Sequence, residues 1–170
     1  MAVSTDIVRT YRAPRRVVRD LLARGPREDR ALAFLMVACL LIFVAQWPRL
    51  SREAFLAPEI PLEARMGGAL MGWIFVAPLL AYGLAALTRL VARVLGGQGS
   101  FYSARLALFW SLLAATPLFL LNGLVAGFVG PGPGHMATGI LSSTVFLAFW
   151  GLALVETEGQ SAVVPDQGRQ

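Results

Sequence analysis

Residues 31–47 read ALAFLMVACLLIFVAQW and carry no formal charge. Three further uncharged, apolar runs follow, at about 67–88, 106–129 and 136–155. A bilayer core about 30 Å thick is crossed by roughly 17–25 residues of helix, so each run is long enough to span a membrane, the first at the short end of that range. The repetition predicts an all-α fold, a polytopic transmembrane bundle of about four spans.

The composition agrees with this fold class. Hydrophobic residues make up 56% of the chain, above the roughly 45–50% typical of soluble domains. We expect one transmembrane domain, 31–155, between a polar N-terminal segment, 1–30, and an acidic tail, 156–170, whose composition predicts a flexible end. The first apolar run is expected to be retained as a helix, because a long polar segment precedes it and no small-residue cleavage site follows it.

The arginines predict the topology. All 15 basic residues are arginine, which indicates a GC-rich bacterial genome and hence a bacterial inner membrane. Basic residues near span ends mark the cytoplasmic side. Eight arginines in 1–30, three in 89–105 and Arg169 fall on one side, against three in 48–66 on the other. Both termini are therefore expected in the cytoplasm. This placement accounts for the basic charge without nucleic acid.

A short amphipathic helix is predicted at about 14–24. Pro14 suits a first helical turn, and Gly25 and Pro26 end the segment. A basic amphipathic helix of this kind lies in the membrane interface. The candidate lipid-contacting residues are Arg12, Arg15, Arg16, Val17, Val18, Arg19, Leu21 and Leu22. The alternative, a helix docked on the protein's own bundle, is the less favoured of the two.

Two small-residue steps and two prolines lie inside the apolar runs. Gly68 with Gly72, and Gly123 with Gly127, have the GxxxG spacing that lets helices approach closely; packing within the chain is favoured over a dimer contact. Two residues, Pro78 and Pro117, are expected to kink or open their helices, with Asn122 nearby as a polar candidate. Structural hydrogen bonding is favoured for Asn122 over a transport site.

Chemistry-bearing residues are scarce. The span centres hold no acidic or basic side chain and no histidine, which argues against ion-coupled transport. One histidine, His135, and one cysteine, Cys39, do not form a zinc site of the usual kind. We therefore expect no metal, no cofactor and no catalytic residue. Cys39 is interpreted as a packing residue, and the four tryptophans (Trp47, Trp73, Trp110 and Trp150) are expected near the interfaces.

The segment between the second and third runs resembles a known family. It reads Gly96-Gly97-Gln98-Gly99-Ser100-Phe101 and is followed by a span with the central Pro117. This is similar to the Gly-Gly-x-Gly-Ser/Thr-Phe turn of bacterial Yip-family membrane proteins, as is the proline-led amphipathic N-terminal segment. The resemblance implies a multi-span protein with a cytoplasmic N-terminus. Family members commonly have five spans, and eukaryotic members contact small GTPases in vesicle trafficking; GTPase binding is not carried over to this chain.

The residues of the turn also have a local explanation. Glycines allow backbone with positive φ, and Ser100 is placed to cap the next helix. As a phosphate cradle the turn is weak, since it lacks the P-loop lysine.

Two functions remain open. The favoured one is a non-enzymatic scaffold or accessory subunit that binds another membrane protein, or itself, through helix packing, or that organises anionic lipid through its basic N-terminal helix. The alternative is a small-molecule or lipid permease whose proline-broken helices surround Asn122. Expected partners are membrane lipid and membrane protein, without nucleic acid.

Overall fold

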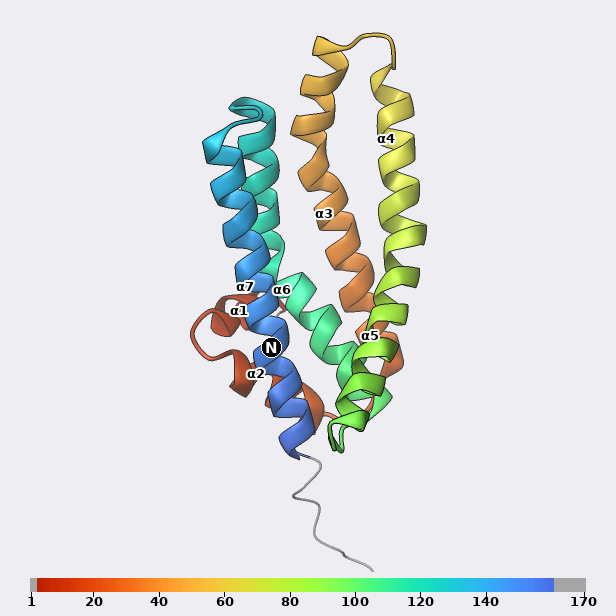
Figure 1. Cartoon of the computed structure of the whole chain (residues 1–170), viewed down its shortest axis with the longest axis vertical. Helices are drawn as coiled ribbons and strands as arrows, with labels where there is room; N and C mark the ends of the chain where they lie inside the picture. The colour runs from red at the N-terminus through yellow and green to blue at the C-terminus, as the bar shows by residue number, and fades with distance from the viewer. Residues whose placement is uncertain (1–2, 161–170) are drawn as a thin grey trace, which may run out of the picture.

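The computed structural model describes residues 3–160, and every regular element in this part is helical (Figure 1). The helices are α1 (Val3–Thr10), α2 (Pro14–Ala23), α3 (Glu28–Leu56), α4 (Leu62–Met71), α5 (Ala77–Val94), α6 (Phe101–Phe128) and α7 (Pro133–Gln160), with a π-turn, η1 (Gly72–Val76), between α4 and α5. Four helical segments are long and apolar enough to cross a membrane: Glu28–Leu56, Leu62–Val94, Phe101–Phe128 and Pro133–Glu158. The predicted all-α bundle with four spans is confirmed.

The bundle has two distinct ends. The end that holds α1, α2 and the α5–α6 turn at 95–100 is called the proximal end below. The distal end holds the α3–α4 connection at 57–61 and the α6–α7 connection at 129–132. In Figure 1 the α3–α4 hairpin and the α6–α7 hairpin stand side by side.

The spans are longer than their apolar runs. α3 continues through Pro48 to Leu56, so the expected loop 48–66 shrinks to 57–61. Continuation is favoured because Leu50 is buried and Arg49 pairs with Glu53 one turn later, at 3.5 Å.

At the other end of the chain, the prediction of a flexible tail from residue 156 onward was wrong for its first residues. α7 runs on to Gln160, and both glutamates that begin the tail, Glu156 and Glu158, form ion pairs with other helices. Residues 161–170 lie outside the described part of the chain.

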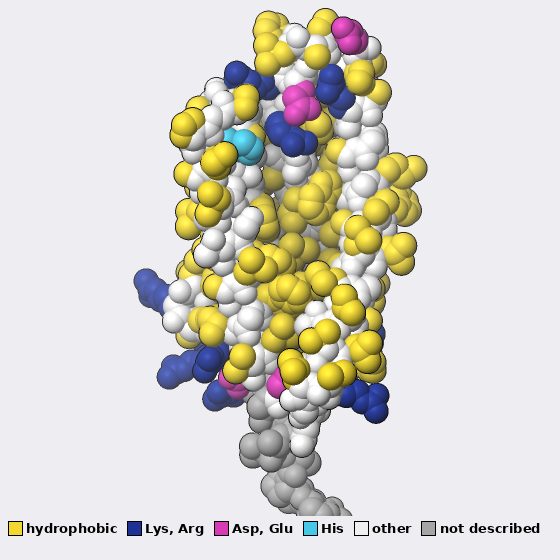
Figure 2. Space-filling model, viewed as in Figure 1, with side chains coloured by type: hydrophobic (Ala, Val, Ile, Leu, Met, Phe, Trp, Pro, Cys, Tyr) yellow, Lys and Arg dark blue, Asp and Glu magenta, His cyan; other side chains and the backbone are white. Residues whose placement is uncertain are grey.

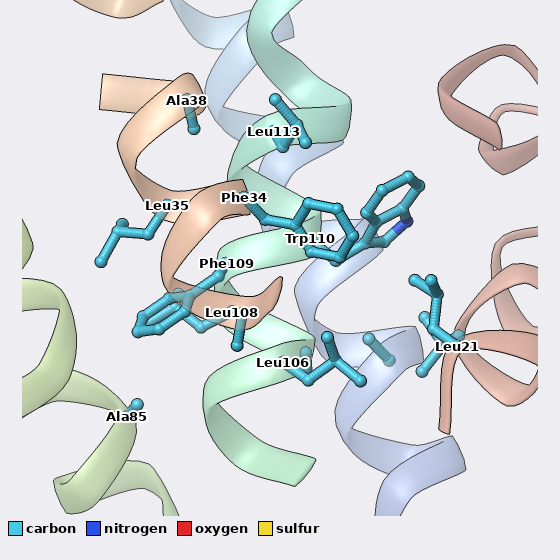
Figure 3. Packing of buried hydrophobic residues seen from close by; sticks show 14 of the residues in the cluster. Leu21, Phe34, Leu35, Ala38, Ala85, Leu106, Leu108, Phe109, Trp110 and Leu113 are labelled. Carbon is cyan, nitrogen blue, oxygen red and sulfur yellow. The ribbon is translucent and has the colours of Figure 1, made fainter. Parts of the chain in front are cut away.

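The apolar core lies in the proximal half, with α6 at its centre (Figure 3). Along α6, buried side chains recur at helical spacing at Leu106, Phe109, Trp110 and Leu113. Phe34 of α3 meets the Trp110 ring edge-on, at a centroid distance of 5.1 Å. Trp110, which the sequence predicts near an interface, is 1% exposed and packs inside the bundle, so its indole does not face lipid. Cys39 is also buried in this core.

The second span stands apart from the others. Only 6% of its most apolar stretch is buried, against 44% in α3, 50% in α6 and 17% in α7. It packs on α3 through α4, η1 and α5, and on α6 through α5. Most of this span consequently faces out of the bundle.

Candidate functional site

Helix α2 covers the predicted range but docks on the protein itself. Val17, Val18 and Leu21 are each 2% exposed and belong to the central core, beside α6 and α7, and Leu22 packs partly buried against it. Insertion of this apolar face among acyl chains, the favoured interpretation, was wrong, and the docked alternative is what the structure shows. The same amphipathic pattern serves both locations, because protein core and lipid are both apolar. The arginines of the prediction, Arg12, Arg15, Arg16 and Arg19, remain exposed.

Helix α1, which was not predicted from the sequence, extends this docked segment. Thr10 accepts a hydrogen bond from Trp110 Nε1 at 3.2 Å, and Tyr11 Oη donates to the carbonyl of Ala114 at 3.0 Å. Partial burial raises the pKa of the Tyr11 phenol above its ordinary value. The two contacts lie one turn apart on α6, so they fix the N-terminal segment along that helix.

The α5–α6 turn has the local geometry expected of its sequence. Gly96 has a φ of +87°, in the left-handed region that favours glycine. Ser100 is the N-cap of α6: its side chain accepts from the Ser103 N–H at 3.0 Å, and the Ser103 hydroxyl accepts from the Ser100 N–H at 2.9 Å. Phe101, the first residue of α6, is exposed.

Gly97 and Gly99 are needed for a different reason, which the sequence alone did not reveal. The Gly99 N–H donates to Glu158 Oε2 at 2.8 Å, so a carboxylate from the end of α7 sits on the turn. A Cβ at Gly97 would collide with that carboxylate, and one at Gly99 would lie 2.6 Å from Glu158 Oε1. Arg89 pairs with Glu158 at 3.4 Å and donates to the Gly97 carbonyl at 3.3 Å. The turn thus binds the Arg89–Glu158 ion pair, which connects α5 and α7 at the start of α6.

Further polar contacts close the proximal end. Arg19 of α2 pairs with Glu156 of α7 at 2.9 Å, and the hydrogen bond with this carboxylate and its charge raise the pKa of the guanidinium. Arg105 pairs with Glu28 across α6 and α3. Arg30 donates to the carbonyls of Leu21 and Gly25 at the end of α2. These contacts hold the docked helices in one arrangement.

The two small-residue steps have opposite surroundings. A Cβ added at Gly123 would meet the Ala45 carbonyl, and one at Gly127 would meet Pro48, so this step is where α6 approaches the backbone of α3. The expectation of packing within the chain holds for this pair. At Gly68 and Gly72 an added Cβ would meet nothing within 4 Å. Packing within the chain is therefore wrong for this second pair.

Pro78 and Pro117 are accommodated within their helices. Ahead of Pro78 the helix opens into the π-turn η1, in which the Ala77 N–H donates to the Gly72 carbonyl. Pro117 lacks the N–H that would bond to Leu113, and the Thr116 hydroxyl donates to that carbonyl at 2.7 Å instead. Figure 1 shows α6 changing direction along its length.

Asn122 takes part in a polar cluster at the distal end. Its Oδ1 accepts from the Thr138 hydroxyl at 2.8 Å, which ties α6 to α7. It also lines a cavity of about 180 Å³ together with Gln46 and His135. A second cavity, of about 300 Å³, adjoins it and is bordered by Arg49, Arg52 and His135. Figure 2 shows basic, acidic and histidine side chains gathered at this end above a hollow with apolar walls.

This distal grouping was not predicted from the sequence. Arg49 and Arg52 are three residues apart, and this spacing places them on one helix face if the helix continues past Pro48. His135 follows a Gly-Pro turn, and only the fold of the α6–α7 connection brings it opposite these arginines. Within residues 3–160 no group of three His, Cys, Asp or Glu side chains is placed to hold a metal ion.

Four long apolar helices, packed through small residues and closed at one end by docked helices and ion pairs, define a polytopic α-helical membrane protein. The chain belongs to the Yip1 domain family, which it matches over residues 8–164. The resemblance inferred from the turn at Gly96–Phe101 is thereby confirmed. Neither the comparison with curated proteins nor that with solved structures gives a significant match.

Proposed function

We propose that this Yip1-domain protein is a non-enzymatic scaffold or accessory subunit of a bacterial inner membrane that binds another membrane protein through its second span, Leu62–Val94. The observation that carries the proposal is the open step formed by Gly68 and Gly72, in a span of which only 6% of the apolar stretch is buried. The charge asymmetry favours an orientation with both termini in the cytoplasm.

Helix association supports this assignment. Transmembrane helices associate where small residues let their backbones come close, because lipid supplies no hydrophobic force between them. Gly123 and Gly127 serve this purpose inside the chain, against α3. Gly68 and Gly72 have the same spacing on a helix with free space beside it, so they offer the same contact to a helix from another chain.

The basic face of α2 provides a further contact with the membrane. Arg15 and Arg16 of α2, and Arg12 just before this helix, are exposed beside the docked apolar face. Each arginine near an anionic leaflet contributes on the order of 1 kcal/mol of attraction. Anionic lipid would therefore bind to these side chains while the helix itself stays on the bundle.

The experiment is a pull-down from native membranes in mild detergent, with the tag at the C-terminus and mass spectrometry of the eluate. We expect a stoichiometric membrane protein with the wild-type chain and its loss with Gly68→Ile. Gly83→Ile is the matched control, because Gly83 lies on the same span and also has nothing within 4 Å of an added Cβ. Equal recovery of the partner with both variants, or recovery of the wild-type chain alone, would refute the proposal.

A small-molecule or lipid permease is the second candidate, favoured by the cavity that Asn122 lines. In this case solute or lipid flux into proteoliposomes is expected with the wild-type chain and is expected to be lost with Asn122→Leu. Flux that persists in the variant would remove this candidate.

A further inference from the structure

Polar groups without protein partners border the distal cavity. Arg52 has no carboxylate within 4.0 Å among residues 3–160, and its one hydrogen bond runs from Nη1 to the Gly127 carbonyl at 3.3 Å. Its buried Nε has no partner, and neither does the buried Nδ1 of His135. Buried polar groups are nearly always hydrogen-bonded, so two unsatisfied nitrogens at one cavity indicate a site for a polar ligand, which must offer an acceptor to the Arg52 N–H.

The charge balance of the cavity favours an anion. Its ionisable lining consists of Arg49, Arg52, Glu53 and His135. Glu53 is compensated twice, by Arg49 at 3.5 Å and by Arg65 at 3.4 Å. The guanidinium of Arg52 is left as the uncompensated charge, and a planar guanidinium binds phosphate oxygens in a bidentate manner.

An apolar groove begins on the other side of Arg52. This groove, of about 540 Å³, is bordered by Trp47, Pro48, Phe55 and Phe128 as well as by Arg52 itself. Trp47, Phe55 and Phe128 are 47%, 85% and 80% exposed, so the groove opens outward from α3 and α6. Arg52 thus borders both the cavity that holds the charged side chains and an outward-facing apolar groove, an arrangement that matches a charged headgroup joined to an acyl chain.

We infer that the distal end binds an anionic phospholipid, with its phosphate held by Arg52, Arg49 and an N–H of His135, and an acyl chain in the groove between Trp47 and Phe128. This site lies at the opposite end from the basic face of α2. It does not depend on association through the second span, because none of its residues belongs to Leu62–Val94.

Native mass spectrometry of the detergent-purified full chain tests the inference. With added phosphatidylglycerol we expect one retained lipid per chain, and on the order of tenfold weaker retention in Arg52→Gln, since a hydrogen bond to a charged group is lost. Arg93→Gln, the same change at an exposed residue of α5 remote from the cavity, is expected to retain lipid as the wild type does. Equal retention in all three proteins would overturn the inference.

Two further ligands test whether the site requires a net negative charge and whether it requires a lipid. Phosphatidylcholine, which has a phosphate but no net charge, is expected to be retained at least several-fold less than phosphatidylglycerol; equal retention would overturn the anionic requirement. Inorganic phosphate is expected to leave the bound lipid in place. Binding of inorganic phosphate with the same dependence on Arg52, without lipid retention, would assign the site to a free anion and overturn the lipid.

Folding is checked by the melting temperature of each variant. If Arg52→Gln melts well below the wild type, His135→Ala gives the same test from the opposite wall of the cavity, in the first turn of α7. Reduced lipid retention at an unchanged melting temperature supports the site. Unchanged retention in His135→Ala under those conditions refutes it.

Discussion

Glu158 occupies the space that a side chain at position 99 would need, and this explains a glycine whose φ is not in the left-handed region. Gly99→Ala is expected to destabilise the protein by roughly 0.5–1.5 kcal/mol, because its Cβ displaces the Glu158 carboxylate from the hydrogen bond with the Gly99 N–H. On a Glu158→Ala background the same change is expected to cost less than about 0.5 kcal/mol, because the colliding carboxylate is gone. Denaturant unfolding of the four proteins in detergent measures this coupling, and strictly additive effects would contradict it.

Tyr11 links stability to pH. Burial raises its pKa in the folded protein, so the folded state binds this proton more tightly than the unfolded state does. The contribution is complete below the ordinary pKa of 10.0 and is lost as the pH rises through the folded value. We expect the melting temperature to fall more steeply above pH 10 in the wild type than in Tyr11→Phe. Identical pH profiles would show that the phenol does not contribute.

At the scale of elements, the pattern of apolar residues predicted where the helices lie better than it predicted whether their apolar faces contact lipid or protein. The apolar runs located all four spans, and the sequence around Pro14 located α2 almost to the residue. The buried face of α2 was misplaced because Val17 and Val18 suit lipid and protein equally. The Glu158–Gly99 contact joins residues 59 apart, and no local pattern records such a contact.

The two GxxxG steps have the same spacing in the sequence, but substitutions in them are expected to have different effects on stability. Gly123→Ala is expected to destabilise the protein by about 1–3 kcal/mol or more, because its Cβ would meet the Ala45 backbone, which has no side-chain freedom to move away. Gly68→Ala is expected to be neutral or to stabilise the isolated chain by up to about 1 kcal/mol, the helix-propensity difference. Thermal unfolding in detergent distinguishes them, and a destabilising Gly68→Ala would show a contact of Gly68 within the chain.

The two ends of the whole molecule differ: the proximal end is packed and held by ion pairs, and the distal end contains cavities. At the proximal end the core, the docked helices and the Arg89–Glu158 pair fix four spans relative to one another. At the distal end, cavities bordered by Arg52 and Asn122 lie between α3 and the α6–α7 hairpin. Binding of a ligand is therefore expected in the distal cavities, and binding of a partner helix along the second span, of which little is buried.

The orientation of the molecule is testable with single cysteines on a Cys39→Ser background. Glu59 lies at the distal end and Gln98 at the proximal end, and both are exposed. Since 11 arginines of the described residues flank the proximal side and three the distal side, we expect the proximal end in the cytoplasm. A membrane-impermeant maleimide should label Glu59→Cys in intact spheroplasts and Gln98→Cys only after permeabilisation. The reverse pattern would invert the topology. If every span crosses the membrane, the span Leu62–Val94 places Glu59 and Gln98 on opposite sides. Labelling of both cysteines before permeabilisation would contradict this arrangement.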